Sequence, residues 1–317
     1  MPRYALPLIC VCLCCVPLLA TAVELPNPSF ESGEESPESW TPLPLSLSDP
    51  SYLWDSETAF SGSRSLSTRS TRYRYGRWLA SPQPVENSGY TWYTFSGQVK
   101  TQQNNGEVYL CIAWLDEKGH LITTSDALML PPGDNDWQTV TVDALPAVGA
   151  VSVSFWCISN HNAGQTWFDD LSVTLTNLPG GGDYDQFTRD YPSNPLAVSA
   201  HLMRVQSLMT QAKWIREKGF YDPNAQAQAS ALYAQAAGVS RLDSVLEQAA
   251  PERVEAVKAQ FEALVDSALW EASITAHSAR EVDKAKGYLQ QIVNRDQTAD
   301  FKTRAEGALN ALADRQQ

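Results

Sequence analysis

One segment of the chain combines side chains that suit sugar recognition. Residues 69–78 read RSTRYRYGRW, with four arginines, two tyrosines and one tryptophan. Flat aromatic rings can cover the C–H face of a pyranose, and the rigid arginine fork hydrogen-bonds hydroxyls or pairs with carboxylates and sulfates. In a strand, Arg72 and Arg74 would share one face and Tyr73 and Tyr75 the other. The segment predicts a strand that binds a glycan, neutral or anionic, with the candidate contacts Arg72, Tyr73, Arg74, Tyr75 and Trp78.

The alternative is an exposed strand whose arginines pair with an acidic surface, because charge clusters often form solvated faces. A second candidate contact is Trp156, which alternates with Val153, Phe155 and Cys157. If those three side chains face a core, Trp156 points outward. Other strand tryptophans, such as Trp92, line a binding face or belong to the core.

Catalytic patterns are scarce. The four histidines show no metal-ligand spacing, and the chain has no G-x-S-x-G nucleophile elbow. Carboxylates are plentiful, so a glycosidase pair stays open at this stage. A lyase or hydrolase would need a tyrosine close to an arginine, and residues 73–77 are the place to look. We expect a protein that is not an enzyme.

The N-terminus reads as a secretory signal peptide. Arg3 gives a positive start, residues 5–20 are mostly apolar, and Ala20-Thr21-Ala22 has the small-x-small form of a cleavage site. The apolar run is shorter than the ~20 residues of a membrane span. We expect residues 1–22 to be removed and the protein to be secreted, with an extracellular, periplasmic or cell-surface location.

Cleavage would leave two of the six cysteines, Cys111 and Cys157, in an oxidising compartment. Each lies in a strand-like run. They form a disulfide if the two strands are neighbours and suitably placed, or they stay separate buried thiols. Spacing alone does not decide between the two.

Charge divides the chain into two parts. The formal net charge is −13, which leaves a nucleic-acid partner without a basic surface. Residues 23–194 hold 8 basic and 21 acidic side chains, whereas residues 195–317 hold 14 basic and 15 acidic ones. Composition shifts at the same boundary, in a stretch rich in Pro and Gly. We predict a linker over residues 178–194.

Hydrophobic periodicity also differs between the parts. In residues 23–177, Phe95, Gly97 and Val99 alternate with polar residues, and residues 108–114 are apolar on both faces. These patterns predict an N-terminal antiparallel β-sandwich. Residues 195–317 carry apolar side chains at spacings of three and four, which predicts an all-α helical bundle or short solenoid. Residues 219–247 have low periodicity, and their packing is not predicted.

Four pieces of the β half resemble, in order, the galactose-binding-like jelly roll of secreted carbohydrate-binding modules. They read NPSFE at residues 27–31, FSGSRSL at 60–66, YTFSGQVKT at 93–101 and WFDDLSV at 167–173. The resemblance implies a jelly-roll sandwich that binds a polysaccharide or another glycan.

The same resemblance implies a structural Ca²⁺ that joins the first strand to the last. Its ligands would be Glu31 of the opening motif, Asp169 of the closing motif and carbonyl groups of residues 61–64. Ca²⁺ prefers oxygen ligands of these kinds.

Residues 280–315 loosely resemble a tetratricopeptide-like helix pair, although the full signature does not recur at a fixed period. Together these features predict a secreted, non-catalytic carbohydrate-binding protein with a helical protein-interaction domain. The alternative is an envelope or extracellular scaffold or adhesion protein whose jelly roll no longer binds sugar. Exposed aromatic side chains on the β half favour the first, and an apolar patch on the helical half favours the second.

Overall fold

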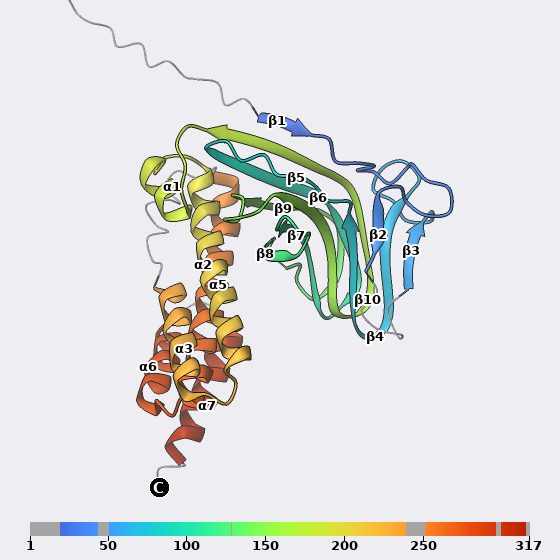
Figure 1. Cartoon of the computed structure of the whole chain (residues 1–317). Coiled ribbons are helices and arrows are strands. Elements are labelled where there is room, and N and C mark those ends of the chain that lie inside the picture. The colour runs from blue at the N-terminus through green and yellow to red at the C-terminus, as the bar shows by residue number, and fades with distance from the viewer. Residues whose placement is uncertain (1–19, 44–50, 128, 239–250, 296–298, 315–317) are drawn as a thin grey trace, which may run out of the picture.

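The computed structural model describes residues 20–43, 51–127, 129–238, 251–295 and 299–314. Strands β1 to β10 occupy its first part and helices α1 to α3 and α5 to α7 its second, which confirms the predicted order of a β-sandwich followed by helices. Figure 1 shows a bundle of helices beside an arch of long strands. Most of the predicted signal peptide, residues 1–19, lies outside the described residues. None of the described helices is long and apolar enough to cross a membrane.

Two long antiparallel strands, β4 (Ser65–Ala80) and β10 (Ser152–Leu178), run through both layers of the sandwich. The first layer, here called the β6 layer, adds β1 (Ala20–Val23), β3 (Ser51–Asp55), β6 (Tyr90–Asn104) and β9 (Gly133–Ala144). The second, the β7 layer, adds β2 (Trp40–Pro42), β5 (Gln83–Pro84), β7 (Glu107–Leu115) and β8 (Leu121–Asp126). The register of β4 with β10 shifts between Ser159 and Gly164, where both strands pass between the layers.

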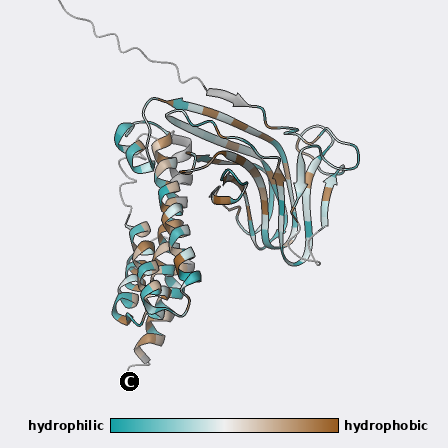
Figure 2. Cartoon of the chain, viewed as in Figure 1, coloured by the Kyte–Doolittle hydropathy of each residue, from teal (hydrophilic) through white to brown (hydrophobic). Residues whose placement is uncertain are grey.

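The core of the sandwich lies between the two layers and is rich in aromatic side chains. Phe95 and Val99 of β6 are fully buried in it, as the predicted alternation requires. Phe155 of the opposite layer packs against Phe95, with ring centroids 5.0 Å apart. In Figure 2, hydrophobic residues recur at intervals along the arched strands. Burying such a side chain contributes about 1.5–3 kcal/mol to folding.

The two cysteines lie on adjacent strands but on opposite faces of the β7 layer. Cys111 of β7 is the register partner of Trp156 in β10, whereas Cys157 is the partner of Leu110. Successive side chains of a strand point to opposite faces, so Cys157 enters the core and Cys111 points away from it. Both are buried free thiols, and the disulfide considered from the sequence does not form.

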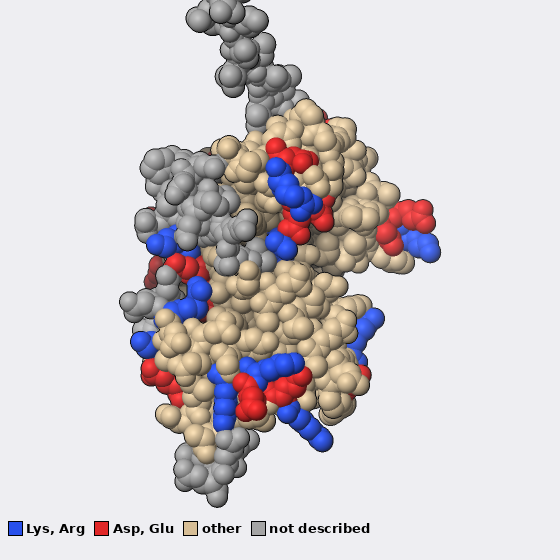
Figure 3. All heavy atoms as spheres, turned by 90° about the vertical axis from the view of Figure 1, so that its left-hand side faces the viewer, with Lys and Arg blue, Asp and Glu red and all other residues tan. Residues whose placement is uncertain are grey.

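The helical half contains α1 (Tyr184–Asp190), α2 (Leu196–Lys218), α3 (Pro223–Ala237), α5 (Pro251–Ser278), α6 (Val282–Asn294) and α7 (Ala299–Asp314). An apolar cluster that includes Val265, Leu289 and Ile292 holds the bundle together. Figure 3, which faces the helical side, shows acidic and basic side chains interspersed. This distribution agrees with the near-neutral charge expected for residues 195–317.

The segment predicted as a linker is part of the packed structure. It contains α1, whose Phe187 is fully buried between Tyr90 and Trp92 of β6, with ring centroids 5.1 and 4.9 Å away. The Tyr90 hydroxyl donates to Asp190, with an O···O distance of 2.8 Å. Burial and the nearby Asp190 raise the pKa of Tyr90 to about 12. An apolar interface, rather than a free linker, therefore joins the two halves.

Candidate functional site

Side chains of four strands form rows across the outer face of the β7 layer. Leu79, Trp156, Cys111 and Asp126 are register partners in one row, from β4 through β10 and β7 to β8. Two residues along, Arg77, Ile158 and Tyr109 make the next row, followed by Asn160 and Glu107. The intervening row contains Cys157 and faces the core, so these rows face away from it. We call this surface the outer face.

The floor of the outer face is apolar and aromatic. Trp156 packs in one cluster with Cys111, Ala113 and Ile158, and Tyr109 lies against them. The indole N–H of Trp156 donates to the Ser154 hydroxyl over 2.9 Å, which fixes the ring. Only 8% of Trp156 is exposed, whereas Tyr109 is half-buried, so Trp156 lies in the floor and Tyr109 reaches the surface.

Charged side chains surround this floor. Arg77 lies on the β4 side, where its Nε donates to the side-chain Oδ1 of Asn160 over 3.4 Å. Glu107 and Asp126 lie on the opposite side, on β7 and β8. Burial raises the pKa of Tyr109, and the negative charges of Asp126 and Glu107 add to that shift. Burial also raises the pKa of Asp126, against hydrogen bonds from Cys111 and Thr124.

A tyrosine–histidine pair continues the outer face where the long strands bend. The Tyr75 hydroxyl hydrogen-bonds to Nε2 of His161, and the two rings meet edge to face with centroids 4.3 Å apart. His161 has a positive φ of 48°, which is uncommon for a residue with a side chain. It lies in the irregular part of β10, where the register with β4 shifts. Tyr75 is 40% exposed, so its ring is open to a ligand.

Five of the six predicted ligand contacts separate into three groups. Tyr75 and Trp156 belong to the outer face, as described above. Tyr73 is 64% exposed and Arg72 is exposed at the strand bend, outside the β7-layer rows. Arg74 is half-buried and donates to the Tyr73 carbonyl oxygen over 3.2 Å.

The prediction for Trp78 was wrong. Its side chain points into the core, where it is 3% exposed and packs edge to face on Tyr52 at 5.4 Å. Its indole N–H donates to the Ser67 carbonyl oxygen. Trp78 follows Arg77 by one residue, and the alternation of the strand therefore puts it on the opposite face.

Sequence reasoning missed most of the outer face. Arg77, Glu107, Tyr109, Asp126 and Asn160 come from four strands that are far apart in the sequence. The pattern of residues 69–78 located one of those strands only. Knowing that β7 pairs with β10 would have pointed to the residues on the neighbouring strands. Strand partners, however, cannot be identified from patterns within one short stretch of sequence.

The two predicted calcium ligands lie at one turn, but N–H groups surround them. Glu31 Oε1 accepts from the backbone N–H groups of Ser63 and Arg64, each at 2.9 Å, and Oε2 accepts from the Ser63 hydroxyl at 2.7 Å. Asp169 Oδ2 accepts from the N–H groups of Phe60 and Ser61 at 2.7 and 3.2 Å. The turn thus presents donors where Ca²⁺ needs oxygen ligands.

These contacts do not favour a calcium ion, and the calcium site stays a prediction of the resemblance. Within the described part of the chain, no group of three His, Cys, Asp or Glu side chains could hold a metal ion. Burial opposes ionisation of Glu31, but the hydrogen bonds from Ser63 and Arg64 outweigh it and lower its pKa. Burial raises the pKa of the enclosed Asp169 to about 6, against its own hydrogen bonds.

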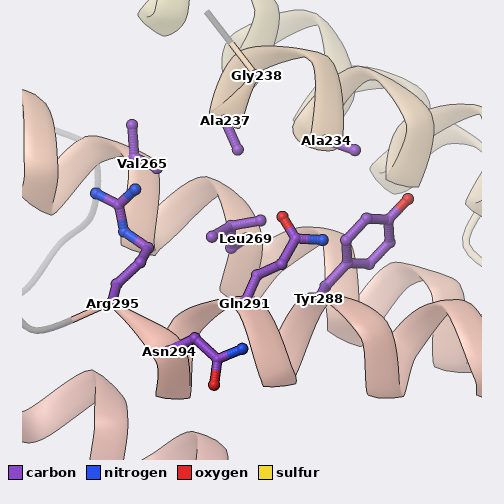
Figure 4. A pocket seen from close by; sticks show the side chains of 9 residues that line it. All are labelled: Ala234, Ala237, Gly238, Val265, Leu269, Tyr288, Gln291, Asn294 and Arg295. Carbon is purple, nitrogen blue, oxygen red and sulfur yellow. The ribbon is translucent and has the colours of Figure 1, made fainter. Parts of the chain in front are cut away.

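A pocket of about 290 Å³ lies in the helical half, between α3, α5 and α6. Its walls are apolar on α5, with Val265 and Leu269, and polar on α6, with Tyr288 and Gln291. Figure 4 shows Tyr288 and Gln291 pointing from α6 toward α3. Arg295 at its rim donates through Nε to Asp266 over 2.8 Å. The pocket can hold an apolar group next to an amide or another hydrogen-bonding group.

The comparisons with known proteins concern the β half. No family model matches the chain, and no curated protein matches it. Solved structures similar to it include the C-terminal family 22 carbohydrate-binding module of Clostridium thermocellum Xyn10B, at 17% identity and a TM-score of 0.34, covering 47% of this chain and 89% of that one. Another is the xylan-binding domain CBM22-1 of Paenibacillus barcinonensis Xyn10C, at 16% identity and a TM-score of 0.36, covering 47% and 92%.

A third similar structure is the enzymatically active domain of tailspike protein 4 from bacteriophage CBA120, at 14% identity and a TM-score of 0.36. The match covers 47% of this chain and 21% of that one, so the chain spans about a fifth of the tailspike. Carbohydrate-binding modules are thus among the structural neighbours of the β half. At these identities and TM-scores, the function has to be derived from the residues of this chain.

Proposed function

We propose that the β half binds a glycan on the outer face of its β7 layer. One observation carries this proposal: Tyr109 and Trp156 share that face with the planar polar groups of Arg77 and Asn160, and Tyr75, two residues before Arg77 on β4, extends it toward the bend. Aromatic rings stack on the C–H faces of sugar rings, and amide and guanidinium groups hydrogen-bond the hydroxyls. The resemblance of the sequence to galactose-binding-like carbohydrate-binding modules supports the same function.

The proposed binding is weak for each site, because sugar hydroxyls exchange hydrogen bonds with water for hydrogen bonds with the protein. The protein is then retained on a polysaccharide when several copies of the protein bind the same polymer chain. In this proposal the protein is secreted after removal of residues 1–22, is not an enzyme, and holds its ligand on a rigid sheet. Calcium has no part in it, because the donor set around Glu31 and Asp169 does not favour the metal.

The helical half is proposed to contact a protein partner. Trp214, Phe220 and Tyr221 at the end of α2 and in the turn after it are 59%, 66% and 94% exposed. Exposed aromatic residues that lie close together are typical of interaction surfaces. The pocket between α3, α5 and α6 also gives this half a recess for an apolar group. The tetratricopeptide-like resemblance of residues 280–315 supports the same role.

A second candidate function is that of an envelope or extracellular scaffold or adhesion protein whose sandwich no longer binds sugar. The exposed aromatic residues of the helical half favour it, and so does the burial of Trp92, which is fully covered by the helices. In this case the helices would be the functional part, and the outer face would be a structural surface.

Retention of the full chain on immobilised polysaccharides tests the proposal. The panel contains neutral, amino-bearing and acidic polymers, and the variants are Tyr75→Ala and its control Tyr73→Ala, which changes an exposed tyrosine two residues away. We expect retention on at least one polymer and its loss in Tyr75→Ala only. Absence of retention on every polymer would favour the scaffold function.

A further inference from the structure

Charge is distributed asymmetrically on the outer face. Arg77 lies on its β4 edge, whereas Glu107 and Asp126 lie on β7 and β8, two and three strands away from β4. With a strand spacing of about 4.8 Å, the backbone positions of these carboxylates are roughly 10–15 Å from that of the arginine, although the positive charge of Arg77 still acts on Asp126. Among the described residues, no ion pair joins Glu107 or Asp126 to a cation.

One carboxylate oxygen of Asp126, on the outer face, lacks a hydrogen-bond donor among the described residues. This oxygen, Oδ1, is buried, while the Cys111 thiol and the Thr124 hydroxyl interact with the carboxyl group. A buried carboxylate oxygen without a donor is costly, and a nearby positive charge reduces that cost. Glu107 is half-buried at the rim of the same face, where a ligand can contact it directly.

We propose that the glycan recognised by the outer face carries protonated amino groups, as in a polymer of glucosamine units. The inference rests on the proposed glycan-binding function and specifies its substrate class. An ammonium group beside Tyr109 would be attracted by the ring face and by the Glu107 carboxylate together. The 21 acidic and 8 basic side chains of residues 23–194 add a long-range field that attracts cations. A uronate or sulfate at the same position would be repelled.

This assignment differs from the anionic ligand considered for the arginine-rich strand. Arg72 is exposed at the strand bend, and Arg74 donates to a backbone carbonyl, so neither extends the outer face toward β7. Arg77 is the arginine of the face, and its Nε is engaged with Asn160. Glu107, two residues from Tyr109 on the same strand, therefore lies beside the half-exposed tyrosine ring, and Arg77 stands in the same row as the ring, on the far side of Ile158.

Binding of the full chain to three polymers at low ionic strength tests the inference. The probes are polyglucosamine at a pH where its amines are protonated, its fully N-acetylated counterpart, and polygalacturonate. We expect polyglucosamine to bind roughly tenfold more tightly than the neutral counterpart, and polygalacturonate to bind most weakly. Added salt should reduce the difference, because it screens surface charges.

The decisive variant is Glu107→Gln, with Glu117→Gln as its control. Glu117 is an exposed carboxylate in the same half, in the turn before β8 and outside the outer face. Loss of the preference in Glu107→Gln alone, with an unchanged melting temperature, supports the inference. Equal losses in both variants, or equally tight binding of polylysine, would show non-specific attraction of a polycation and overturn it.

Two further outcomes separate the inference from the function on which it rests. Polygalacturonate or the N-acetylated polymer binding as tightly as polyglucosamine would overturn the amine preference and leave the glycan-binding function in place. Failure of all three polymers and of the wider neutral panel to bind would overturn both.

Discussion

The carboxylate of Glu31 holds one turn through three hydrogen bonds. Oε1 accepts from the backbone N–H groups of Ser63 and Arg64, and Oε2 accepts from the Ser63 hydroxyl. Gly62, in the same turn, leaves no room for a Cβ, which would lie 2.4 Å from Oε1. Glycine at this position has a φ of +60°, which a side chain would strain. A single acidic residue thus ties the opening motif to the start of β4.

The first prediction concerns removal of that charge. Glu31→Gln should lower the free energy of unfolding by about 1–2 kcal/mol at neutral pH, because hydrogen bonds to a charged acceptor become bonds to a neutral one. Denaturant unfolding measures the change. Glu35→Gln, an exposed residue nearby, should change it by less than about 0.5 kcal/mol.

The same residue predicts a pH dependence. Its pKa in the folded protein lies below the ordinary value of 4.5, so its contribution is fully present above pH 4.5. The contribution is lost as the pH falls through the folded-state pKa. The stability difference between the native protein and Glu31→Gln should therefore shrink below pH 4.5, and a constant difference down to pH 3 would contradict this account.

Metal removal provides a separate test at the same turn. Because N–H donors surround Glu31 and Asp169, a chelator should leave the melting temperature unchanged, and added Ca²⁺ should not raise it. Differential scanning fluorimetry is sufficient for this measurement. A fall in the melting temperature that Ca²⁺ restores would show that the metal reorganises this turn.

At the level of the elements, the bend of β10 is the feature that shapes the outer face. Gly164 lies at this bend with a φ of +153°, and an added Cβ would lie 2.6 Å from the Gln102 carbonyl oxygen. Gly149, in another loop, also has a positive φ of +84°, but open space surrounds its Cα. A side chain would strain the backbone at both positions, but it would also collide with neighbouring atoms at Gly164.

We therefore predict unequal effects of the same substitution. Gly164→Ala should destabilise the protein by about 2–4 kcal/mol, since strain and crowding add together. Gly149→Ala should cost about 1 kcal/mol, from strain alone. Thermal unfolding of the two variants compares them, and equal costs would contradict the crowding seen at the bend.

Elements with strong periodicity could be predicted from the sequence. The alternation around Phe95 identified β6, and the apolar run of residues 108–114 identified β7 as a central strand. Helix α3 was missed because it buries alanines, Ser230 and Tyr233 rather than a stripe of large apolar residues. Small side chains pack closely against α2 and α5 but give little contrast in hydropathy.

At the scale of the whole molecule, the contact between its two halves was not predictable from the sequence. Pro- and Gly-rich composition indicated a linker, yet α1 inserts Phe187 between rings of β6. Ser199 of α2 adds a hydrogen bond of 2.8 Å to Asp143 at the end of β9. Contacts between segments that are distant in the sequence decide this interface, as they decide which strands form the outer face.

The interface makes a further prediction. Phe187→Ala should lower the free energy of unfolding by about 3–5 kcal/mol, because it leaves a cavity between Tyr90 and Trp92. Phe220→Ala removes a ring that is 66% exposed and should change it by less than about 0.5 kcal/mol. Denaturant unfolding distinguishes the two, and a small effect of Phe187→Ala would mean that the halves are only loosely joined.

The central claim is that the outer face of the β7 layer binds a glycan, and side-chain footprinting tests it most directly. Hydroxyl radicals would oxidise exposed tyrosines of the full chain with and without a saturating oligosaccharide from a polymer that binds. The account predicts that Tyr75 and Tyr109 become protected, while Tyr221, 94% exposed in the helical half, reacts at an unchanged rate. Protection of Tyr221 with none at Tyr75 or Tyr109 would contradict it and place the ligand on the helices.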